Sequence, residues 1–388
     1  MSDDKKLKEQ MVKWRHHFHE NPEIAFREVK TAAFLAGELR RMGLDVHEGI
    51  GKTGVVADLK VGNGNTVIGL RADMDAICLP ETGTVSYQSR NEGVMHACGH
   101  DGHMATLLGA VKILSETRNF NGTVHCIFQP AEEPGRGSQA MIDDHLLMDY
   151  PMDEIYGLHN VPFIPAGEIH TRKSGIMASE DNFIIRIHGK GGHASSPHMG
   201  TDPLVIASQV ILGLQTIVSR SANPLEPAVV SCTELLTDGA HNAIPSNVEI
   251  RGDTRSCSPG MQQLIEDRMR AISENSCQMY GAGCEFIYTH EFTPVVNWDA
   301  CTETAINAAA AVVGPEHVNA NCNPWMASED FGIFLKYIPG CFVFLGSGVC
   351  EKAKDNIMVH NSDYDYNDEV LLTGAKFFAT LIAQRIPA

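Results

Sequence analysis

The sequence predicts an α/β fold in which a largely buried sheet forms one domain and a smaller α+β unit is inserted into it. Helical and extended patterns alternate through the first and last thirds of the chain, which is typical of a sheet covered by helices. The middle third follows the order β-α-β-β-α-β, the pattern of a ferredoxin-like unit. A chain of 388 residues is also longer than one hydrophobic core usually organises, so two domains are expected.

The first third supplies helices and strands in mixed order. Apolar residues at helical spacing predict the helices, and Gly43 ends the second of them. Asn63-Gly64 lies between two strand-like runs and predicts a hairpin. The expected elements are helices at 6–18, 31–42 and 102–116, and strands at 55–61, 66–70, 123–128 and 154–158.

The middle third closes on itself, which predicts an insert at 181–292 between two parts of one larger domain, 1–180 and 293–388. The insert's expected elements are strands at 183–188, 228–235, 248–254 and 284–289, and helices at 202–220 and 260–279. The last third adds helices at 300–313 and 368–385 and a strand at 341–345.

Composition excludes several classes of protein. Hydrophobic residues make up 43% of the chain and charged residues 20%, which indicates a folded globular protein. A formal net charge of -18 argues against nucleic-acid and anionic-membrane partners. The start of the chain lacks the apolar core of a secretory signal, and we expect no apolar run near the roughly 20 residues that span a bilayer. The 11 irregularly spaced cysteines favour reduced thiols and a cytoplasmic location.

The densest group of chemically active side chains lies in the segment His96–His103. It holds three His and one Cys directly before a predicted helix. Cys98 and His100 offer a thiolate and an imidazole from one tight loop, so the segment predicts metal ligation. The alternative is a buried cysteine beside histidines that are only structural.

Two adjacent carboxylates, Glu132 and Glu133, follow a predicted apolar strand. Neighbouring side chains point in different directions, so one can bind a metal while the other acts as a general base. A solvated acidic turn is the alternative. His159 and His360 are weak signals when taken singly, but they supply the imidazoles that a metal centre would still need.

Further motifs extend along nearly the whole chain in a fixed order. They are His19–Glu23, Arg71–Ala76, Gly191–Ala194, Asn242–Pro245, Ser328–Phe331 and His360-Asn361. Together with the two groups above, this set closely resembles metal-dependent amidohydrolases. That family includes hippurate hydrolase, bacterial N-acyl-amino-acid amidohydrolases and plant indole-3-acetyl-amino-acid hydrolases, within the superfamily of aminoacylase and glutamate carboxypeptidase.

The resemblance implies a metallopeptidase-like catalytic domain with an inserted ferredoxin-like lid that also dimerises. It implies two divalent metal ions per subunit, and the donor set admits zinc, manganese, nickel or cobalt. Glu132 resembles the general base. Asp73 resembles a carboxylate that orients a ligand, although it could instead be a strand-end turn residue. The implied metal ligands are Cys98, His100, Glu133, His159 and His360.

Three residues of the insert match lid positions of the family. His193 resembles a histidine that polarises the scissile carbonyl across a subunit interface. Asn242 and Arg255 resemble residues that contact substrate. The alternatives are that Asn242 shapes a turn and that Arg255 is a surface cation.

The expected activity is metal-dependent hydrolysis of the amide bond of small N-acyl amino acids, by a homodimer joined through the lids. Glu132 would act first as base and then as acid. A dipeptidase or carboxypeptidase on the same scaffold is the alternative. A metal-binding protein without catalysis is a more distant one, since such a protein needs no base beside ligand Glu133.

Overall fold

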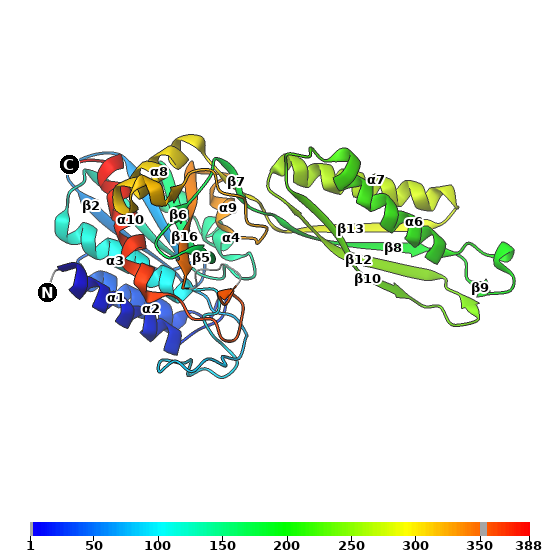
Figure 1. The fold of residues 1–388 in the computed structure, drawn as a ribbon, viewed down its shortest axis with the longest axis horizontal. Coiled ribbons are helices and arrows are strands. Elements are labelled where there is room, and N and C mark those ends of the chain that lie inside the picture. The colour runs from blue at the N-terminus through cyan, green and yellow to red at the C-terminus, as the bar shows by residue number, and fades with distance from the viewer. Residues whose placement is uncertain (1–2, 350–354) are drawn as a thin grey trace. The chain divides into compact units, whose positions relative to one another are not determined.

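The computed structural model describes residues 3–349 and 355–388, and the chain forms two compact units (Figure 1). The first unit comprises Met1–Ile176, Val296–Asn323 and Asp330–Ala388. The second comprises Met177–Val295 and a short return segment, Pro324–Glu329. The metal-ligand candidates all belong to the first unit.

The first unit is built on an eight-stranded sheet in the order β1-β2-β4-β3-β5-β16-β6-β15. Its middle strands β4, β3, β5 and β16 run parallel, which brings their carboxyl ends to one edge. All nine residues of β16 are buried, as expected for a central parallel strand. The strands are β1 Asp45–Ile50, β2 Gly54–Val61, β3 Val67–Asp73, β4 Gly122–Gln129, β5 Glu154–Pro165, β6 Ile169–His170, β15 Val318–Asn319 and β16 Gly340–Gly348.

Helices enclose this sheet, and their apolar faces share one core with it (Figure 1). Helix α3 is buried along most of its length and carries His100 as its first residue. The helices of at least seven residues are α1 Asp3–Glu20, α2 Val29–Arg41, α3 His100–Thr117, α4 Gly137–Asp143, α8 Asp299–Val313 and α10 Leu371–Arg385. Shorter helical segments are α5 Leu146–Asp149, α9 Phe331–Phe334, η3 Pro315–His317 and η5 Asp368–Val370.

The second unit is a four-stranded antiparallel sheet in the order β10-β12-β8-β13, with two helices packed on it. This is the strand order of a ferredoxin-like fold, as the sequence pattern predicts. Local signals define both helix starts: Asp202 caps α6 and Ser258 caps α7, each followed by a proline. The main elements are β8 Glu180–His188, α6 Pro203–Thr216, β10 Ala228–Thr237, β12 Asn247–Ser256, α7 Pro259–Met279 and β13 Gly283–Phe292.

The short connecting elements complete the described chain. A small ribbon pairs β9 Gly192–His193 with β11 Ala243–Ile244. A second two-stranded pair joins β7 Ser174–Met177 with β14 Val295–Asn297. The segment η1 Pro197–Met199 precedes α6, and η2 Ile217–Ser221 directly follows it.

The hairpin predicted at Asn63-Gly64 is wrong. Strands β2 and β3 flank this turn, but β4 lies between them in the sheet. The turn is tied instead to the start of β4, because Asn121 Oδ1 accepts the backbone N–H groups of Asn63 and Gly64 at 3.0 and 2.7 Å. The hairpin in this region joins β1 to β2.

One helix contradicts the expectation that no apolar run approaches the length needed to span a bilayer. Within the described residues, Pro203–Ser221 is long and apolar enough to cross a membrane by length and composition, with a mean hydropathy of 1.4. Its residues Ile206, Val210 and Leu214 are buried in the core of the second unit. Only 28% of its apolar window is buried, and Val205 and Leu212 are exposed.

Candidate metal centre

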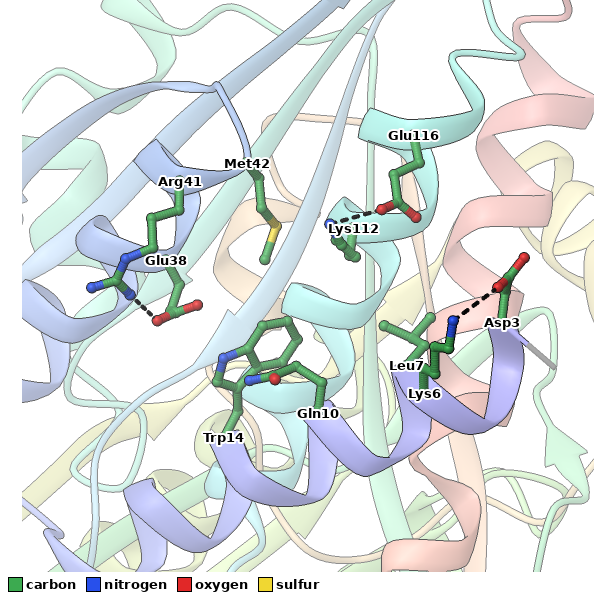
Figure 2. A pocket seen from close by; sticks show the side chains of 10 residues that line it. All are labelled: Asp3, Lys6, Leu7, Gln10, Trp14, Glu38, Arg41, Met42, Lys112 and Glu116. Carbon is green, nitrogen blue, oxygen red and sulfur yellow. Dashed lines mark hydrogen bonds and ion pairs between the residues drawn. The ribbon is translucent and has the colours of Figure 1, made fainter. Parts of the chain in front are cut away.

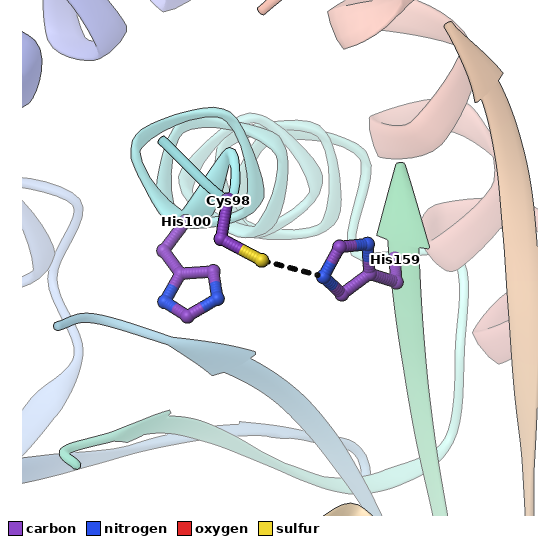
Figure 3. Close-up of side chains that lie close together, drawn as sticks. All are labelled: Cys98, His100 and His159. Carbon is purple, nitrogen blue, oxygen red and sulfur yellow. Dashed lines mark hydrogen bonds between the residues drawn. The ribbon is translucent and has the colours of Figure 1, made fainter. Parts of the chain in front are cut away.

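Cys98, His100 and His159 converge at the carboxyl edge of the first unit's sheet (Figure 3). Cys98 and His100 come from the loop that opens α3, and His159 projects from β5. All three are buried, their donor atoms lie within 4.8 Å of one another, and Cys98 Sγ is 3.4 Å from His159 Nε2. Gly99 makes the tight loop possible, because its φ is +97° and an added Cβ would lie 2.3 Å from Asn160 Oδ1.

A second set of donors shares Cys98 with the first. Cys98, Glu133 and His360 also have donor atoms within 4.8 Å of one another, and His360 Nε2 lies 3.4 Å from Glu133 Oε2. His360 reaches this position in a left-handed backbone conformation with φ +63°, and its N–H donates to Ala97 O at 2.7 Å. The five metal-ligand candidates are therefore brought together, although His360 lies more than 250 residues from Cys98 in the chain.

Two buried atoms in this cluster lack the partners that buried polar atoms normally have. His100 Nδ1 hydrogen-bonds Asp75 O at 2.8 Å, whereas His100 Nε2 and Glu133 Oε1 have no hydrogen-bond partner among the described residues. With Nδ1 as donor, the neutral ring offers the lone pair of Nε2 to the cluster. A thiol, imidazoles and carboxylates around such atoms fit a divalent metal ion.

The electrostatics of the cluster also favour a cation. Burial and the carboxylates of Glu133 and Glu132 raise the pKa of the Cys98 thiol well above its usual value. Burial alone would lower the pKa of His100, but Asp73 and the other nearby carboxylates raise it to about 10. Excess negative charge in a buried space is what a bound metal ion would neutralise.

Asp75 holds the acidic pair in place, and the sequence reasoning did not identify it. Its Oδ1 and Oδ2 accept the backbone N–H groups of Glu132 and Glu133 at 3.0 and 3.1 Å. Its carbonyl accepts the His100 Nδ1–H. One residue just beyond the end of β3 thus orients three members of the cluster. Its signal in the sequence was its place in the motif Arg71–Ala76, two residues after Asp73.

Asp73 lies beside the cluster, as the sequence reasoning expected, and it has two strong partners. Its Oδ1 is 2.6 Å from His103 Nδ1, and its Oδ2 accepts from Arg71 Nη1 at 2.8 Å. Burial alone would raise the pKa of Asp73, yet His100, His103 and Arg71 hold it well below the usual value. The donors of Asp73, His100 and His103 also lie within 4.8 Å of one another, so Asp73 could serve either as a ligand or as an orienting group.

The three remaining candidates belong to the second unit. His193 is exposed on β9, and its Nδ1 accepts the Ser195 backbone N–H at 3.1 Å. Asn242 is exposed in the loop before β11, and its carbonyl accepts the Ala194 N–H at 3.0 Å. Arg255 on β12 already contacts Glu180 at 2.9 Å and Asp253 at 3.0 Å.

A separate hollow of about 720 Å³ lies between α1, α2 and α3 (Figure 2). Its charged groups pair with one another, as Lys112 does with Glu116 at 2.7 Å and Arg41 with Glu38. The indole nitrogen of Trp14, which also lines it, is itself buried. Among the described residues, the hollow has no group of metal-ligand atoms like the one around Cys98, where His100 Nε2 and Glu133 Oε1 lack hydrogen-bond partners.

Comparison with known proteins is consistent with this centre. The model of the peptidase family M20/M25/M40 matches residues 69–384. The chain is 40% identical to a hippurate hydrolase of Campylobacter jejuni over 376 residues, which cover 97% of this chain and 96% of that protein. It is 35% identical to thermostable carboxypeptidase 2 of Saccharolobus solfataricus over 385 residues, with 98% and 96% of the two chains covered.

A solved structure agrees along the whole length. A dinuclear metal-binding peptidase from Bacillus subtilis superposes with a TM-score of 0.86 and 31% identity, covering 98% of this chain and 99% of that one.

Proposed function

The chain belongs to peptidase family M20/M25/M40, and from this premise we propose that it hydrolyses the amide bond of N-acyl amino acids. The products would be a carboxylic acid and a free amino acid. The observation that carries the proposal is the buried donor cluster around Cys98, which has unpartnered ligand atoms directly beside Glu132.

The cluster would hold two divalent metal ions, since it offers two donor sets that have Cys98 in common. Its first donor set is Cys98, His100 and His159, and its second is Cys98, Glu133 and His360. When bound, the metal ions would polarise the scissile carbonyl and lower the pKa of a water molecule. The thiolate, imidazole and carboxylate donors admit zinc, manganese, nickel or cobalt.

Glu132 would move the proton in this reaction. Its side chain is buried, and Asp75 fixes its backbone N–H, so the carboxylate has a defined position. As the base, it would take a proton from the attacking water. As the acid, it would then return the proton to the leaving amine. Asp73 would orient the ring of His103, whose Nδ1 lies 2.6 Å from Asp73 Oδ1, beside the donor cluster.

The second unit would supply groups that bind substrate. Because His193 Nδ1 accepts a backbone N–H, a neutral ring carries its proton on Nε2 and can donate it to a carbonyl oxygen. Asn242 is exposed on the neighbouring loop and can contact substrate. A substrate carboxylate at Arg255 would compete with Glu180 and Asp253, so this assignment needs its own test.

Peptide hydrolysis is the second candidate, favoured by the similarity to a carboxypeptidase. The two activities share their chemistry and differ in the acyl group accepted. We would compare kcat/KM for N-acetyl, N-benzoyl and N-indoleacetyl amino acids with kcat/KM for dipeptides. Higher values for the N-acyl amino acids support the proposal, and higher values for dipeptides favour the peptidase. A protein that binds metal but turns over neither class would be the non-catalytic alternative.

We also propose a cytoplasmic homodimer joined through the second units. The cysteines of the described residues form no disulfide, which suits a reducing compartment. Strand β10 is an edge of its sheet, with Leu235 and Leu236 exposed. On α6, Val205 is 50% and Leu212 70% exposed. Exposed apolar side chains beside a free strand edge are suited to pairing with another copy.

Co-expression of two inactive variants tests whether a dimer shares its sites. Chains with Glu132→Gln and chains with His193→Ala should together regain activity, because one mixed site would contain both intact residues. The homodimers of each variant are the controls. Heterodimers that form and stay as inactive as their parents would show that His193 does not act across the interface.

A further inference from the structure

Helix α1 carries two polar residues on the face that it buries. Its buried residues are Met11, Trp14, Arg15, Phe18 and His19, which is the spacing of an apolar stripe. Arg15 and His19 are both 0% exposed. Arginine is almost never fully buried without ionic partners. The buried face of α1 must therefore do more than pack against the core. The sequence motif that begins at His19 has no role in the site described above.

Arg15 joins two chain segments that lie far apart in sequence. Its Nη1 is 3.6 Å from Asp101 and 2.8 Å from Asp365, and its Nε donates to Asp368 at 2.8 Å. Asp101 directly follows His100 at the start of α3. Asp365 and Asp368 follow His360 on the segment that leads into η5. A single buried guanidinium therefore links the neighbourhoods of two metal-ligand candidates.

Neighbouring contacts make this link rigid. The Arg15 guanidinium lies 4.4 Å from the centre of the Tyr87 ring, and the Tyr87 hydroxyl donates to Asp365 at 2.7 Å. One helical turn further along, His19 Nδ1 is 2.8 Å from Asp101 Oδ2. Asp101 is thus held from two positions on the same face of α1.

Stability alone is a poor explanation for this arrangement. Replacing buried ion pairs by well-packed apolar residues is often neutral or stabilising, because charges are costly to desolvate. Apolar contacts, however, are non-directional and do not fix the orientation of the groups that they bring together. A planar guanidinium directs its hydrogen bonds. Here they go to Asp365 and Asp368, whereas Asp101 at 3.6 Å is held as an ion pair.

We propose that Arg15 is a positioning residue that sets the spacing of His100 and His360, and with it the affinity for metal. The proposal rests on the metal centre proposed above. Arg15 does not touch the donor atoms. It acts through Asp101 on the start of α3, and through Asp365 and Asp368 on the segment of His360.

Metal dissociation constants, measured by competition with a chelator, test this role without relying on catalysis. Arg15→Met should weaken metal binding by about 10–100-fold, as loss of groups that orient ligands commonly does. Arg15→Lys should recover part of the affinity, because lysine keeps the charge but lacks the fork. Excess metal should restore most of the activity of both variants.

A pair of neighbouring variants provides the matched control. Asp368 and Glu369 both pair with α1. Asp368 bonds to Arg15 at 2.8 Å and to His16 at 3.0 Å, whereas Glu369 bonds to the surface residue Lys8 at 2.6 Å. Asp368→Asn should weaken metal binding, whereas Glu369→Gln should leave it unchanged. Because neither variant changes Arg15, this comparison tests the positioning role even if Arg15→Met fails to fold.

The thermal midpoint of each metal-free variant separates positioning from general stability. If Arg15→Met and Asp368→Asn lower the midpoint but bind metal within about twofold of wild type, Arg15 is structural and the proposal is overturned. If wild type itself binds no divalent metal, the proposed function fails together with this inference. Equal, tight binding in every variant overturns the positioning role alone.

Discussion

Asp75→Asn is the substitution whose effect follows most directly from the geometry of the site. The Asp75 side chain is 1% exposed and accepts the backbone N–H groups of Glu132 and Glu133 with one oxygen each. Asparagine has the same shape but only one acceptor oxygen. One of the two N–H groups would then face an NH₂ donor, and the loop of the acidic pair would have to shift.

The size of the effect can be worked out from these contacts. A hydrogen bond to a charged group contributes about 1.5–3 kcal/mol, and a buried N–H left without an acceptor costs about 1–3 kcal/mol. We therefore expect the free energy of unfolding to fall by about 2.5–6 kcal/mol. Since the side chain of Asp75 holds the backbone of ligand candidate Glu133, metal affinity should fall by about 10–100-fold. The bond from His100 goes to the main-chain carbonyl of residue 75, which the substitution keeps.

Denaturant unfolding and chelator competition measure the two quantities. The control is Asp144→Asn, which perturbs a carboxylate bond to a backbone N–H, that of Gly51 at 2.8 Å, at an exposed position of the same unit. The control should lose less stability than Asp75→Asn and keep its metal affinity. If Asp75→Asn bound metal as tightly as wild type, Asp75 would not be what orients the acidic pair.

Two further predictions concern the metal ligands and the loop of the acidic pair. Cys98→Ala and His360→Ala should each lower bound metal, measured by elemental analysis; full occupancy in both would mean that the metal is held elsewhere. Gly137→Ala should destabilise the turn after Glu133, because the added Cβ would lie 1.6 Å from Pro130 O. A clash of this kind costs on the order of 1–3 kcal/mol or more, so an unchanged thermal midpoint would contradict it.

Local signals explain which parts of the fold the sequence predicts. The order of elements in the second unit is readable because each helix starts at a cap followed by proline, at Asp202-Pro203 and Ser258-Pro259. The same kind of local reasoning fails at Asn63-Gly64. A turn signal predicts only that the chain bends. It cannot predict that β4, which begins more than 50 residues after this turn, pairs between the two flanking strands.

The residues of the candidate site also fall into two groups, those with a local sequence signal and those without one. Cys98, His100, Glu132 and Glu133 stand out because reactive residue types cluster within short segments. Arg15 carries no such signal, since its partner Asp368 lies 353 residues further along the chain. A positioning residue such as Arg15 is recognisable only once the fold brings its partners together.

Turnover of an N-acyl amino acid by Glu132→Gln, with metal content determined on the same sample, tests whether Glu132 is the general base. Glutamine keeps the shape of the side chain but cannot accept the proton of the attacking water. We predict an unchanged metal content and a kcat lowered by about 10²–10⁴-fold, equivalent to about 3–5 kcal/mol of transition-state stabilisation. A fully metal-loaded Glu132→Gln enzyme with near wild-type kcat would contradict it.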